Sequence, residues 1–380
     1  MTALRTGNVG FNDREQGPLW IRLDVSIILL TAGLIAMGLL VVFSATRGVV
    51  SGDDLPDTTV LQKQIIFAVV GLVGAGVVAS IDYRKARAFV PIAYAAALVL
   101  LVGLFFFGST FNNATSWYSI GGVTLQPSEF AKISLILAMA AWFSNARSAA
   151  GLRFLDVIMG LGFAGLFAVL VIQQPDYGTV MVYGAIVTGV VVVAGVKPWH
   201  AGVVVLMLGG LVAFAFSTNT IQSYQIDRFI AFADENSTER YNVDQSEIAI
   251  GNGGLTGQGL FQGTQNNNSL VPEKETDFIF SVLGEELGFV GGAALLVLFG
   301  LLLMRIWRIA HLAENDFGRL IAVGVFSMFL FQAFQSVGMN MGMMPVTGIP
   351  LPLISAGGSS MITSLLAIGL VENVHAHRLR

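Results

Sequence analysis

The residues of this sequence that could do chemistry in an apolar setting begin with a glutamate and a lysine three positions apart. Glu129 and Lys132 stand in the stretch QPSEFAK, where Pro127 opens an apolar run. Proline suits the first turn of a helix, and a spacing of three places both charges on one helix face. Two interpretations stay open, because the pair could neutralise itself as an internal ion pair or could form a polar site that faces a cavity.

A second acidic residue, Asp176, lies in the stretch QQPDYGT between two apolar runs. Aspartate next to proline commonly caps the following helix or turns the chain ahead of it. The local pattern favours this structural interpretation, and a role at a polar site is the alternative.

The third candidate is Asp277, in the stretch TDFIF where a polar segment meets an apolar run. A carboxylate in the first turn of a helix is stabilised by the helix dipole, so a structural role would account for it. Asp277 also stands at the edge of the apolar region, where a cavity reached by solvent would open.

Glu285 and Glu286 follow this aspartate within the same apolar run. At about 100° per residue they point roughly 80° and 180° away from it, so the three carboxylates do not share one helix face. We expect at least one of the two glutamates to pack against another helix. Gly284, Gly288 and Gly292 recur every four residues around them, a spacing that lets a neighbouring helix approach closely.

The composition defines the setting in which these few charges act. Of the 380 residues, 54% are hydrophobic and 12% are charged, whereas soluble globular proteins have about 25% charged residues. There are four histidines and no cysteines, and the net charge is −4. These counts exclude disulfides and cysteine-based metal sites, and they argue against nucleic-acid binding. The sequence has no P-loop or dinucleotide motif, so it predicts no nucleotide or redox cofactor.

The apolar runs predict an all-α, polytopic membrane protein with about ten transmembrane helices. Each run is long enough to cross the hydrocarbon core of a bilayer as a helix. The predicted spans are Leu23–Thr46, Gln62–Ile81, Ala88–Phe107, Pro127–Ser144, Leu155–Gln173, Thr179–Gly195, Ala201–Phe216, Asp277–Arg305, Leu320–Asn340 and Ser355–Val374.

The distribution of basic residues predicts the orientation of these spans. If the spans alternate, fourteen of the twenty Lys and Arg residues fall on one side, which the positive-inside rule assigns to the cytoplasm. Both termini are then cytoplasmic. The predicted organisation is an N-terminal tail at 1–22, a membrane domain at 23–374 and a C-terminal tail at 375–380. No segment is typical of a cleaved signal peptide.

Two loops on the outer side stand out in this arrangement. The loop 217–276, between the seventh and eighth helices, has 60 residues, eight of them acidic. A loop of this length is usually functional or disordered. The second, Gly342–Ser355, contains three prolines among glycines. Such backbone is tolerated beside a bilayer where it is packed in protein or lines a cavity.

Five longer stretches carry a resemblance to a known family. They are Trp117–Lys132 ending in QPSEFAK, QQPDYGT at Gln173–Thr179, GLTGQGLFQGTQ at Gly254–Gln265, VPEKETDFIFSVLGEELGFVG at Val271–Gly291 and TGIPLPLISAGGSS at Thr347–Ser360. In this order they resemble the SEDS family (shape, elongation, division and sporulation), the RodA and FtsW group of bacterial cell-wall glycosyltransferases. The run FQGTQ is more similar to RodA than to FtsW.

The resemblance implies a ten-helix SEDS-type fold that polymerises lipid II on the outer face of the bacterial cytoplasmic membrane. It places the catalytic aspartate, as general base, at Asp277, and a cavity pair at Glu129 and Lys132. Either Lys132, Arg47 or a divalent cation such as Mg²⁺ or Mn²⁺ would neutralise the leaving pyrophosphate. Further substrate-binding residues implied by the motifs are Asp176, Gln174, Thr179, Thr276, Ser359 and Ser360.

The resemblance also implies partners and marks three departures. The implied partners are lipid II and undecaprenyl-linked glycan, membrane lipids and a class B penicillin-binding protein that crosslinks the new glycan. Many family members have His where this chain has Glu275, Tyr where it has Ala356, and a basic residue where it has Ser116. These departures concern the contacts of the loops.

Three alternative functions share the same composition. A flippase or other transporter for lipid II would also be an apolar bundle with few buried charges, although the chain shows no internal repeat typical of many transporters. A division-specific polymerase of FtsW type, serving cell division rather than elongation, is the second alternative. The third is a scaffold that holds an enzyme partner.

Overall fold

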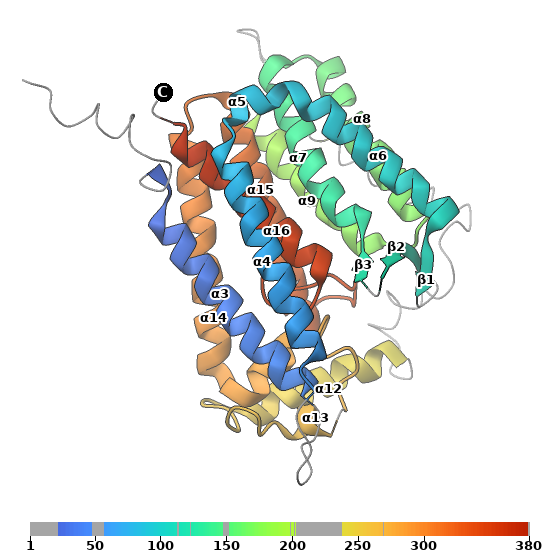
Figure 1. Ribbon diagram of the computed structural model, residues 1–380, viewed down its shortest axis with the longest axis vertical. Helices are drawn as coiled ribbons and strands as arrows, with labels where there is room; N and C mark the ends of the chain where they lie inside the picture. The colour runs from blue at the N-terminus through green and yellow to red at the C-terminus, as the bar shows by residue number, and fades with distance from the viewer. Residues whose placement is uncertain are drawn as a thin grey trace, which may run out of the picture.

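The structure is a computed structural model that describes residues 22–47, 57–111, 114–121, 123–146, 152–197, 199–200, 202, 238–268 and 270–378. Within these ranges the chain is mostly helical, and its long helices pack into one bundle (Figure 1). Nine of the ten predicted spans correspond to one helix each in the described ranges. The nine are α3 (Val25–Thr46), α4 (Thr59–Ser80), α6 (Val90–Phe107), α7 (Pro127–Ala146), α8 (Phe154–Ile172), α9 (Tyr177–Val193), α14 (Ile279–Leu312), α15 (Asp316–Asn340) and α16 (Gly358–Ala376).

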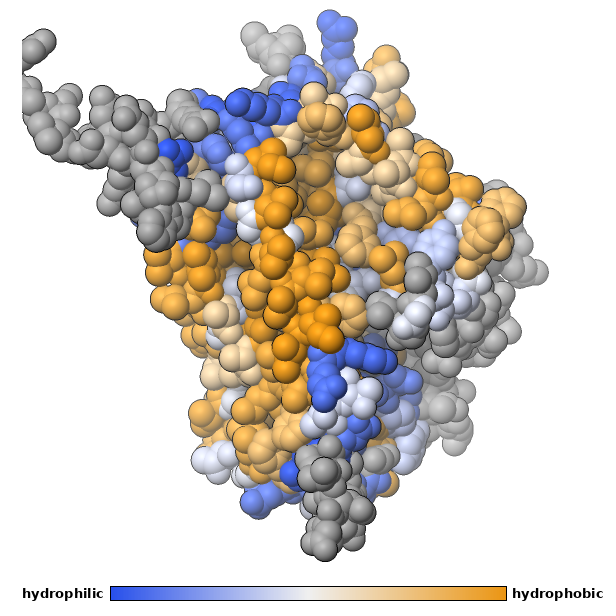
Figure 2. All heavy atoms as spheres, in the orientation of Figure 1, coloured by the Kyte–Doolittle hydropathy of each residue, from blue (hydrophilic) through white to orange (hydrophobic). Residues whose placement is uncertain are grey.

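Six segments of the described chain are long and apolar enough to cross a membrane, judged by length and composition. They are α3, α4, α8, α14, α15 and the segment Tyr83–Phe107, which contains α6. Apolar surface covers the middle of the bundle, with hydrophilic residues gathered towards both ends (Figure 2). The predicted helical, polytopic architecture is confirmed. The count of ten stays a prediction, because the seventh span, Ala201–Phe216, lies outside the described residues apart from Gly202.

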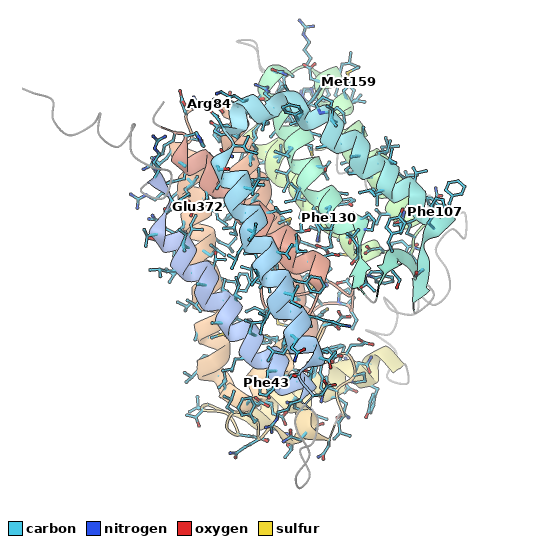
Figure 3. The ribbon with its side chains drawn as sticks, in the orientation of Figure 1. Phe43, Arg84, Phe107, Phe130, Met159 and Glu372 are labelled. Atoms are coloured by element: carbon cyan, nitrogen blue, oxygen red, sulfur yellow. The ribbon has the colours of Figure 1, made fainter. Side chains whose placement is uncertain are left out.

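The two ends of the bundle differ in what they carry. The end with α5 (Tyr83–Ala86), the 3₁₀ turn η1 (Arg87–Phe89) and the last described residues is called the terminal end here. The opposite end, with α12 (Thr238–Gly253) and α13 (Thr264–Asn267), is called the loop end. In Figure 3 the labelled Arg84 and Glu372 lie at the terminal end, and Phe43 lies at the loop end. Both α12 and α13 belong to the predicted outer loop.

A small antiparallel sheet at the loop end adds to the predicted helical fold. Its strands β1 (Ser109–Phe111), β2 (Ala114–Ile120) and β3 (Val123–Leu125) follow one another in the order β1-β2-β3. Tyr118 Oη donates a hydrogen bond to the carbonyl oxygen of Leu100 in α6 at 2.8 Å, which fastens the sheet to the bundle. Strands this short show too little alternation to be recognised from the sequence.

The proline-containing loop ahead of α16 turns back into the bundle, and residues 342–357 are called the re-entrant loop here. The side chains of Ile349, Leu351 and Leu353 are each at most 2% exposed. Gly38 of α3 packs against the loop so closely that a Cβ on it would lie 2.7 Å from the carbonyl oxygen of Leu353. The loop therefore lies within protein, as predicted for irregular backbone at the depth of a spanning helix.

The helix α14 is broken at Gly288, where φ is 65° and ψ is −162°. The chain ahead of α13 supplies hydrogen bonds on both sides of the break. The amides of residues 258–259 donate to the carbonyls of residues 285–286 at 2.9 and 3.1 Å, and the amides of residues 289–290 donate to the carbonyls of residues 254–255 at 2.9 and 3.1 Å. The break thus leaves these backbone groups satisfied.

Candidate active site

Asp277 lies in a turn two residues ahead of α14 and not, as predicted, in the first turn of the helix. Its amide donates to the carbonyl oxygen of Glu273 at 3.1 Å, and the amides of Thr276 and Phe278 donate to the same oxygen at 3.2 Å. Asp277 is half-buried. Its carboxylate Oδ2 lies 3.7 Å from the place where a Cβ on Gly348 would stand, and Gly348 has a φ of +68°. The carboxylate therefore faces re-entrant backbone at a position that favours glycine.

The re-entrant loop is tied to the turn of Asp277 by two hydrogen bonds. Ser355 Oγ donates to the carbonyl of Thr276 at 2.6 Å, and the amide of Ala356 donates to the carbonyl of Glu275 at 2.8 Å. Ser355 Oγ also accepts from the amide of Leu351 at 2.9 Å. Glu275 and Ala356, two departures from the family pattern, thus meet through their backbones, and this contact does not depend on their side chains.

Gln64 of α4 holds the same loop from another side. Its Nε2 donates to the carbonyl of Ser355 at 2.9 Å, and its Oε1 accepts from the amide of Gly357 at 3.1 Å. The side chain is 2% exposed. Sequence reasoning did not single out Gln64. The sequence signal for Gln64 was a side-chain amide within an apolar predicted span, because a buried side-chain amide needs hydrogen-bond partners.

Asp176 caps α9, which confirms the structural interpretation of this residue. Its Oδ1 accepts from the amide of Thr179 at 3.1 Å, and its Oδ2 accepts from Thr179 Oγ1 at 2.8 Å. Gln126 Nε2 and Ser128 Oγ also donate to Oδ2, each at 2.9 Å. The carboxylate therefore joins the start of α7 to the start of α9 as well as capping the latter.

The N-terminal ends of α7, α9 and α16 meet at the re-entrant loop. The amide of Gln126 donates to Ser359 Oγ at 2.9 Å, which joins the start of α7 to that of α16. At the start of α9, a Cβ on Gly178 would lie 2.5 Å from the carbonyl oxygen of Thr347. Helix N-termini carry partial positive charge, so their meeting favours an anion at this place.

Glu129 and Lys132 form an ion pair near the start of α7. Lys132 Nζ lies 2.7 Å from Glu129 Oε2, and the two side chains are 2% and 5% exposed, respectively. Tyr183 Oη donates to the carbonyl of the neighbouring Ser128 at 3.0 Å. The interpretation as an internal ion pair is confirmed, and the role of the pair in a substrate cavity stays a prediction.

Two of the predicted substrate-binding residues make contacts away from the turn of Asp277. Arg47 donates to the carbonyl of Phe261 at 2.6 Å, and its guanidinium carbon lies 4.7 Å from the centre of the Phe261 ring. Gln174 donates through Nε2 to the carbonyl of Leu101 in α6 at 2.9 Å, and its own carbonyl accepts from Ser116 Oγ at 2.8 Å. Arg47 thus anchors the chain ahead of α13, and Gln174 packs on α6.

The remaining predicted substrate-binding residues lie around the re-entrant loop. Thr179 donates to the Asp176 carboxylate through its amide and its hydroxyl. Thr276 Oγ1 donates to the carbonyl of Glu273 at 3.3 Å, next to Asp277. Ser360 is 7% exposed in the first turn of α16. The binding roles of these residues stay predictions, although most of them lie in one region.

Glu285 and Glu286 hold α13, which confirms the expectation that at least one of them is a packing partner. The carboxylate of Glu285 accepts from the amides of Gln265 and Asn266 at 2.7 and 3.0 Å. Glu286 Oε1 accepts from Ser44 Oγ of α3 at 2.5 Å and from Asn266 Nδ2 at 2.9 Å. The two carboxylates thereby connect α3, α13 and the first segment of α14.

The expected close approach at the glycine repeat is made by α12. A Cβ on Gly253 would lie 1.9 Å from the carbonyl oxygen of Gly284, so the two backbones are in direct contact.

In the described ranges no three or more His, Cys, Asp or Glu side chains gather in a way that could hold a metal ion. A divalent cation at the site stays a prediction.

The chain is similar to proteins of known family over nearly its whole length. Residues 25–380 match the family FTSW_RODA_SPOVE, described as cell cycle protein. The peptidoglycan glycosyltransferase MrdB of Escherichia coli is 35% identical over 361 residues, which cover 94% of this chain and 95% of MrdB.

Solved structures show the same similarity. The rod shape determining protein RodA of Thermus thermophilus aligns with a TM-score of 0.72 and 31% identity over 96% of this chain and 100% of RodA. A chain from a peptidoglycan synthase complex, studied for its coordination of polymerization and crosslinking, aligns with a TM-score of 0.79 and 31% identity. That alignment covers 94% of this chain and 98% of the other.

Proposed function

This chain belongs to the FtsW, RodA and SpoVE family of cell cycle proteins, and on that premise we propose that it is a peptidoglycan glycosyltransferase that polymerises lipid II. The observation that carries the proposal is the placement of Asp277. Its half-buried carboxylate faces Gly348 of a loop that contacts the start of α9 at Gly178 and leads into the start of α16. A carboxylate in such a place combines a base with an environment that favours an anionic leaving group.

The chemistry needs one base and one anion-stabilising region. Polymerisation joins a sugar hydroxyl to an anomeric carbon whose leaving group is a lipid pyrophosphate. Conversion of an α-linked donor to a β-linked product is a single inverting displacement, which requires a general base and no carboxylate nucleophile. Asp277 removes the hydroxyl proton as the new C–O bond forms and the bond to pyrophosphate breaks. A positioned base contributes about 10²–10⁴-fold to the rate.

Stabilisation of the leaving pyrophosphate is assigned mainly to the N-terminus of α16. Lys132 is paired with Glu129 at 2.7 Å, so the pair adds little net charge. Each helix N-terminus carries the equivalent of about half a positive charge. The carboxylate of Asp176 offsets this charge at the starts of α7 and α9, whereas the start of α16 has no capping side chain. Arg47 is engaged by Phe261, so we give it no direct part in this step.

We place the activity in cell elongation, with the site on the outer face of the bacterial cytoplasmic membrane and both termini in the cytoplasm. The similarity to rod shape determining RodA and to MrdB supports the elongation role. The similarity to a chain of a peptidoglycan synthase complex supports a crosslinking partner, which we propose to be a class B penicillin-binding protein. The excess of basic residues at the predicted cytoplasmic side supports the orientation.

The test is to incubate the purified full-length protein in detergent micelles with lipid II and to separate the products by size. We expect glycan polymer from the wild type and none from Asp277→Ala, at equal yield of folded protein. A micelle has no two compartments, so a transporter would leave lipid II unchanged in this assay. Lipid II left monomeric by the wild type, together with its movement across vesicles containing the protein, would establish the flippase alternative instead.

A further inference from the structure

Asn340, the last residue of α15, reaches with its side chain into the first turn of α14. It is fully buried. Its Nδ2 donates to the carbonyl oxygen of Asp277 at 2.8 Å, and its Oδ1 accepts from the amide of Ser281 at 3.0 Å. In a continuous α-helix the amide of Ser281 would donate to the carbonyl of Asp277, four residues earlier. The carboxamide of Asn340 thus takes both partners of one missing helical hydrogen bond.

Further contacts fix the orientation of this carboxamide. The second N–H of Asn340 Nδ2 donates to the carbonyl of Ser336, one turn earlier in α15, at 2.8 Å. The backbone carbonyl of Asn340 accepts from Ser246 Oγ of α12 at 2.8 Å. Both side-chain N–H groups therefore have acceptors and Oδ1 has a donor. An amide rotated by 180° would place its N–H groups against the amide of Ser281 and lose these bonds.

We propose that Asn340 is a positioning residue, which holds Asp277 outside α14 so that its carboxylate faces Gly348. The inference rests on the proposed function, because it assigns Asn340 a part in the same reaction. Without the carboxamide, the amide of Ser281, which also donates to the carbonyl of Phe278 at 3.1 Å, can shift to the carbonyl of Asp277. That pairing would extend the helix backwards and turn the carboxylate away from the re-entrant loop. A misplacement of about 1 Å can cost roughly 10²-fold in rate.

A second buried asparagine provides a matched control at the other end of the bundle. Asn373 of α16 is 2% exposed. Its Oδ1 accepts from the amide of Tyr83 at 3.1 Å, and its Nδ2 donates to the carbonyls of Val78, at 2.5 Å, and Ile81. Asn373 therefore performs the same task, the joining of two segments through their backbones, with no contact to the turn of Asp277.

The first experiment compares Asn340→Ala with Asn373→Ala in the full-length protein, at equal amounts of folded protein, using lipid II as substrate. We expect Asn340→Ala to lower kcat by about 10- to 100-fold with little change in KM, because the base is displaced while the binding region remains. Asn373→Ala should lower thermal stability and leave kcat near the wild-type value. An equal fall of kcat in both variants would overturn the positioning role.

The second experiment reads the position of residue 277 without catalysis. The chain has no cysteine, so Asp277→Cys introduces a single thiol whose labelling by a water-soluble maleimide reports its exposure. We expect Asn340→Ala to change the labelling rate severalfold in this background and Asn373→Ala to leave it unchanged. If the wild type makes no polymer, the proposed function fails, whereas the labelling comparison still decides the positioning. Labelling that is insensitive to Asn340→Ala would overturn it.

The conservative variant Asn340→Asp gives a third measurement. A protonated carboxyl can keep both bonds, because its O–H donates to the carbonyl of Asp277 and its C=O accepts from Ser281. Burial, the acidic residue Asp277 that Asn340 contacts, and Glu247 of α12, whose carboxylate lies against Gly342, favour this protonated form. The kcat of Asn340→Asp relative to wild type should therefore fall as pH rises, while that of Asn340→Ala stays low throughout. If the ratio of the kcat of Asn340→Asp to that of the wild type does not change with pH, a protonated carboxyl does not replace the hydrogen bonds of the carboxamide.

Discussion

Asp82 at the terminal end of the bundle and Asp176 at the loop end hold their carboxylates by different means. At the terminal end, Arg84 Nε lies 3.2 Å from Asp82 Oδ1, and Arg84 Nη1 lies 2.8 Å from Glu314 Oε2. At the loop end, Asp176 accepts four hydrogen bonds from neutral donors, and the turn of Asp277 is fixed through its backbone. A neighbouring cation offsets the charge of Asp82, whereas hydrogen bonds from amides and hydroxyls stabilise the charge of Asp176.

The pKa of Asp82 illustrates the difference. Burial raises the pKa of Asp82, but the hydrogen bonds from Arg84 and its charge outweigh burial, and the pKa lies below its ordinary value of 3.8. A lowered pKa makes a carboxylate a weaker base. At Asp176 the loop end instead uses amide and hydroxyl donors, while the nearby Glu129 is paired with Lys132.

The largest effect is expected from the removal of a single carboxylate at each end. Asp277→Asn should lower the rate of glycan polymerisation by about 10²–10⁴-fold, because the general base is lost. Asp82→Asn should leave the rate per folded protein within about twofold, since an isolated surface ion pair contributes little. Product analysis on size-separating gels checks both. Equal losses in the two variants would remove the distinction between the ends.

The next effect concerns the buried ion pair. Glu129→Ala leaves Lys132 buried without its partner, which should lower the free energy of unfolding by about 3–5 kcal/mol. Thermal unfolding in detergent, together with the yield of folded protein, measures this loss. The double variant Glu129→Ala with Lys132→Met should recover much of the stability, because it removes the unpaired buried charge. A double variant as unstable as Glu129→Ala would contradict this account of the pair.

A pair of glycines tests the contact between Asp277 and the re-entrant loop. Gly348 and Gly195 have φ values of +68° and +82°, and a Cβ on Gly195, at the terminal end, would meet nothing within 4 Å. Alanine at either position should cost about 1–2 kcal/mol of backbone strain. Only Gly348→Ala should also lower kcat, because strain in the backbone at position 348 would shift the loop that the Asp277 carboxylate faces. Matching kcat values in the two variants would argue against this contact.

The smallest effect concerns acid stability at the terminal end. Because the folded-state pKa of Asp82 is lowered, its ionised form stabilises the fold above the ordinary value of 3.8, and this contribution is lost as pH falls through the lowered pKa. The wild type should therefore lose stability below about pH 4, and Asp82→Asn should lose less over the same interval. Unfolding midpoints measured from pH 6 down to pH 3 provide the comparison. Equal losses of stability in the wild type and in Asp82→Asn between pH 6 and pH 3 would exclude a contribution from Asp82.

The sequence was informative where the interacting residues are close along the chain. The cap at Asp176 and the ion pair of Glu129 with Lys132 involve partners three residues away, so spacing alone made them predictable. Gln64 finds its partner 291 residues away and Asn340 finds Asp277 63 residues away. Such pairings depend on how the helices assemble, which helical periodicity does not encode.

The same limit explains Arg47, a predicted ligand of pyrophosphate. Its type and position near the end of α3 suited an anion, but the fold brings Phe261 to it from 214 residues away. The carbonyl oxygen of Phe261 accepts a hydrogen bond from the guanidinium, and the Phe261 ring packs against it. A residue type indicates what a side chain can bind, and only the assembled fold decides which of its possible partners is within reach.

The break in α14 has a consequence for the depth of the reaction in the membrane. The part of α14 behind Gly288, residues 289–312, is about 36 Å long at roughly 1.5 Å per residue. Arg305 and Arg308 lie near the far end of this part, so its apolar length, residues 289–304, is about 24 Å at roughly 1.5 Å per residue. A hydrocarbon core about 30 Å thick therefore also takes in the residues next to the break, and in the proposed orientation we expect the turn of Asp277 at the level of the polar headgroups. A lipid-linked donor carries its pyrophosphate at this same level, so the substrate needs no displacement from its leaflet to reach the base.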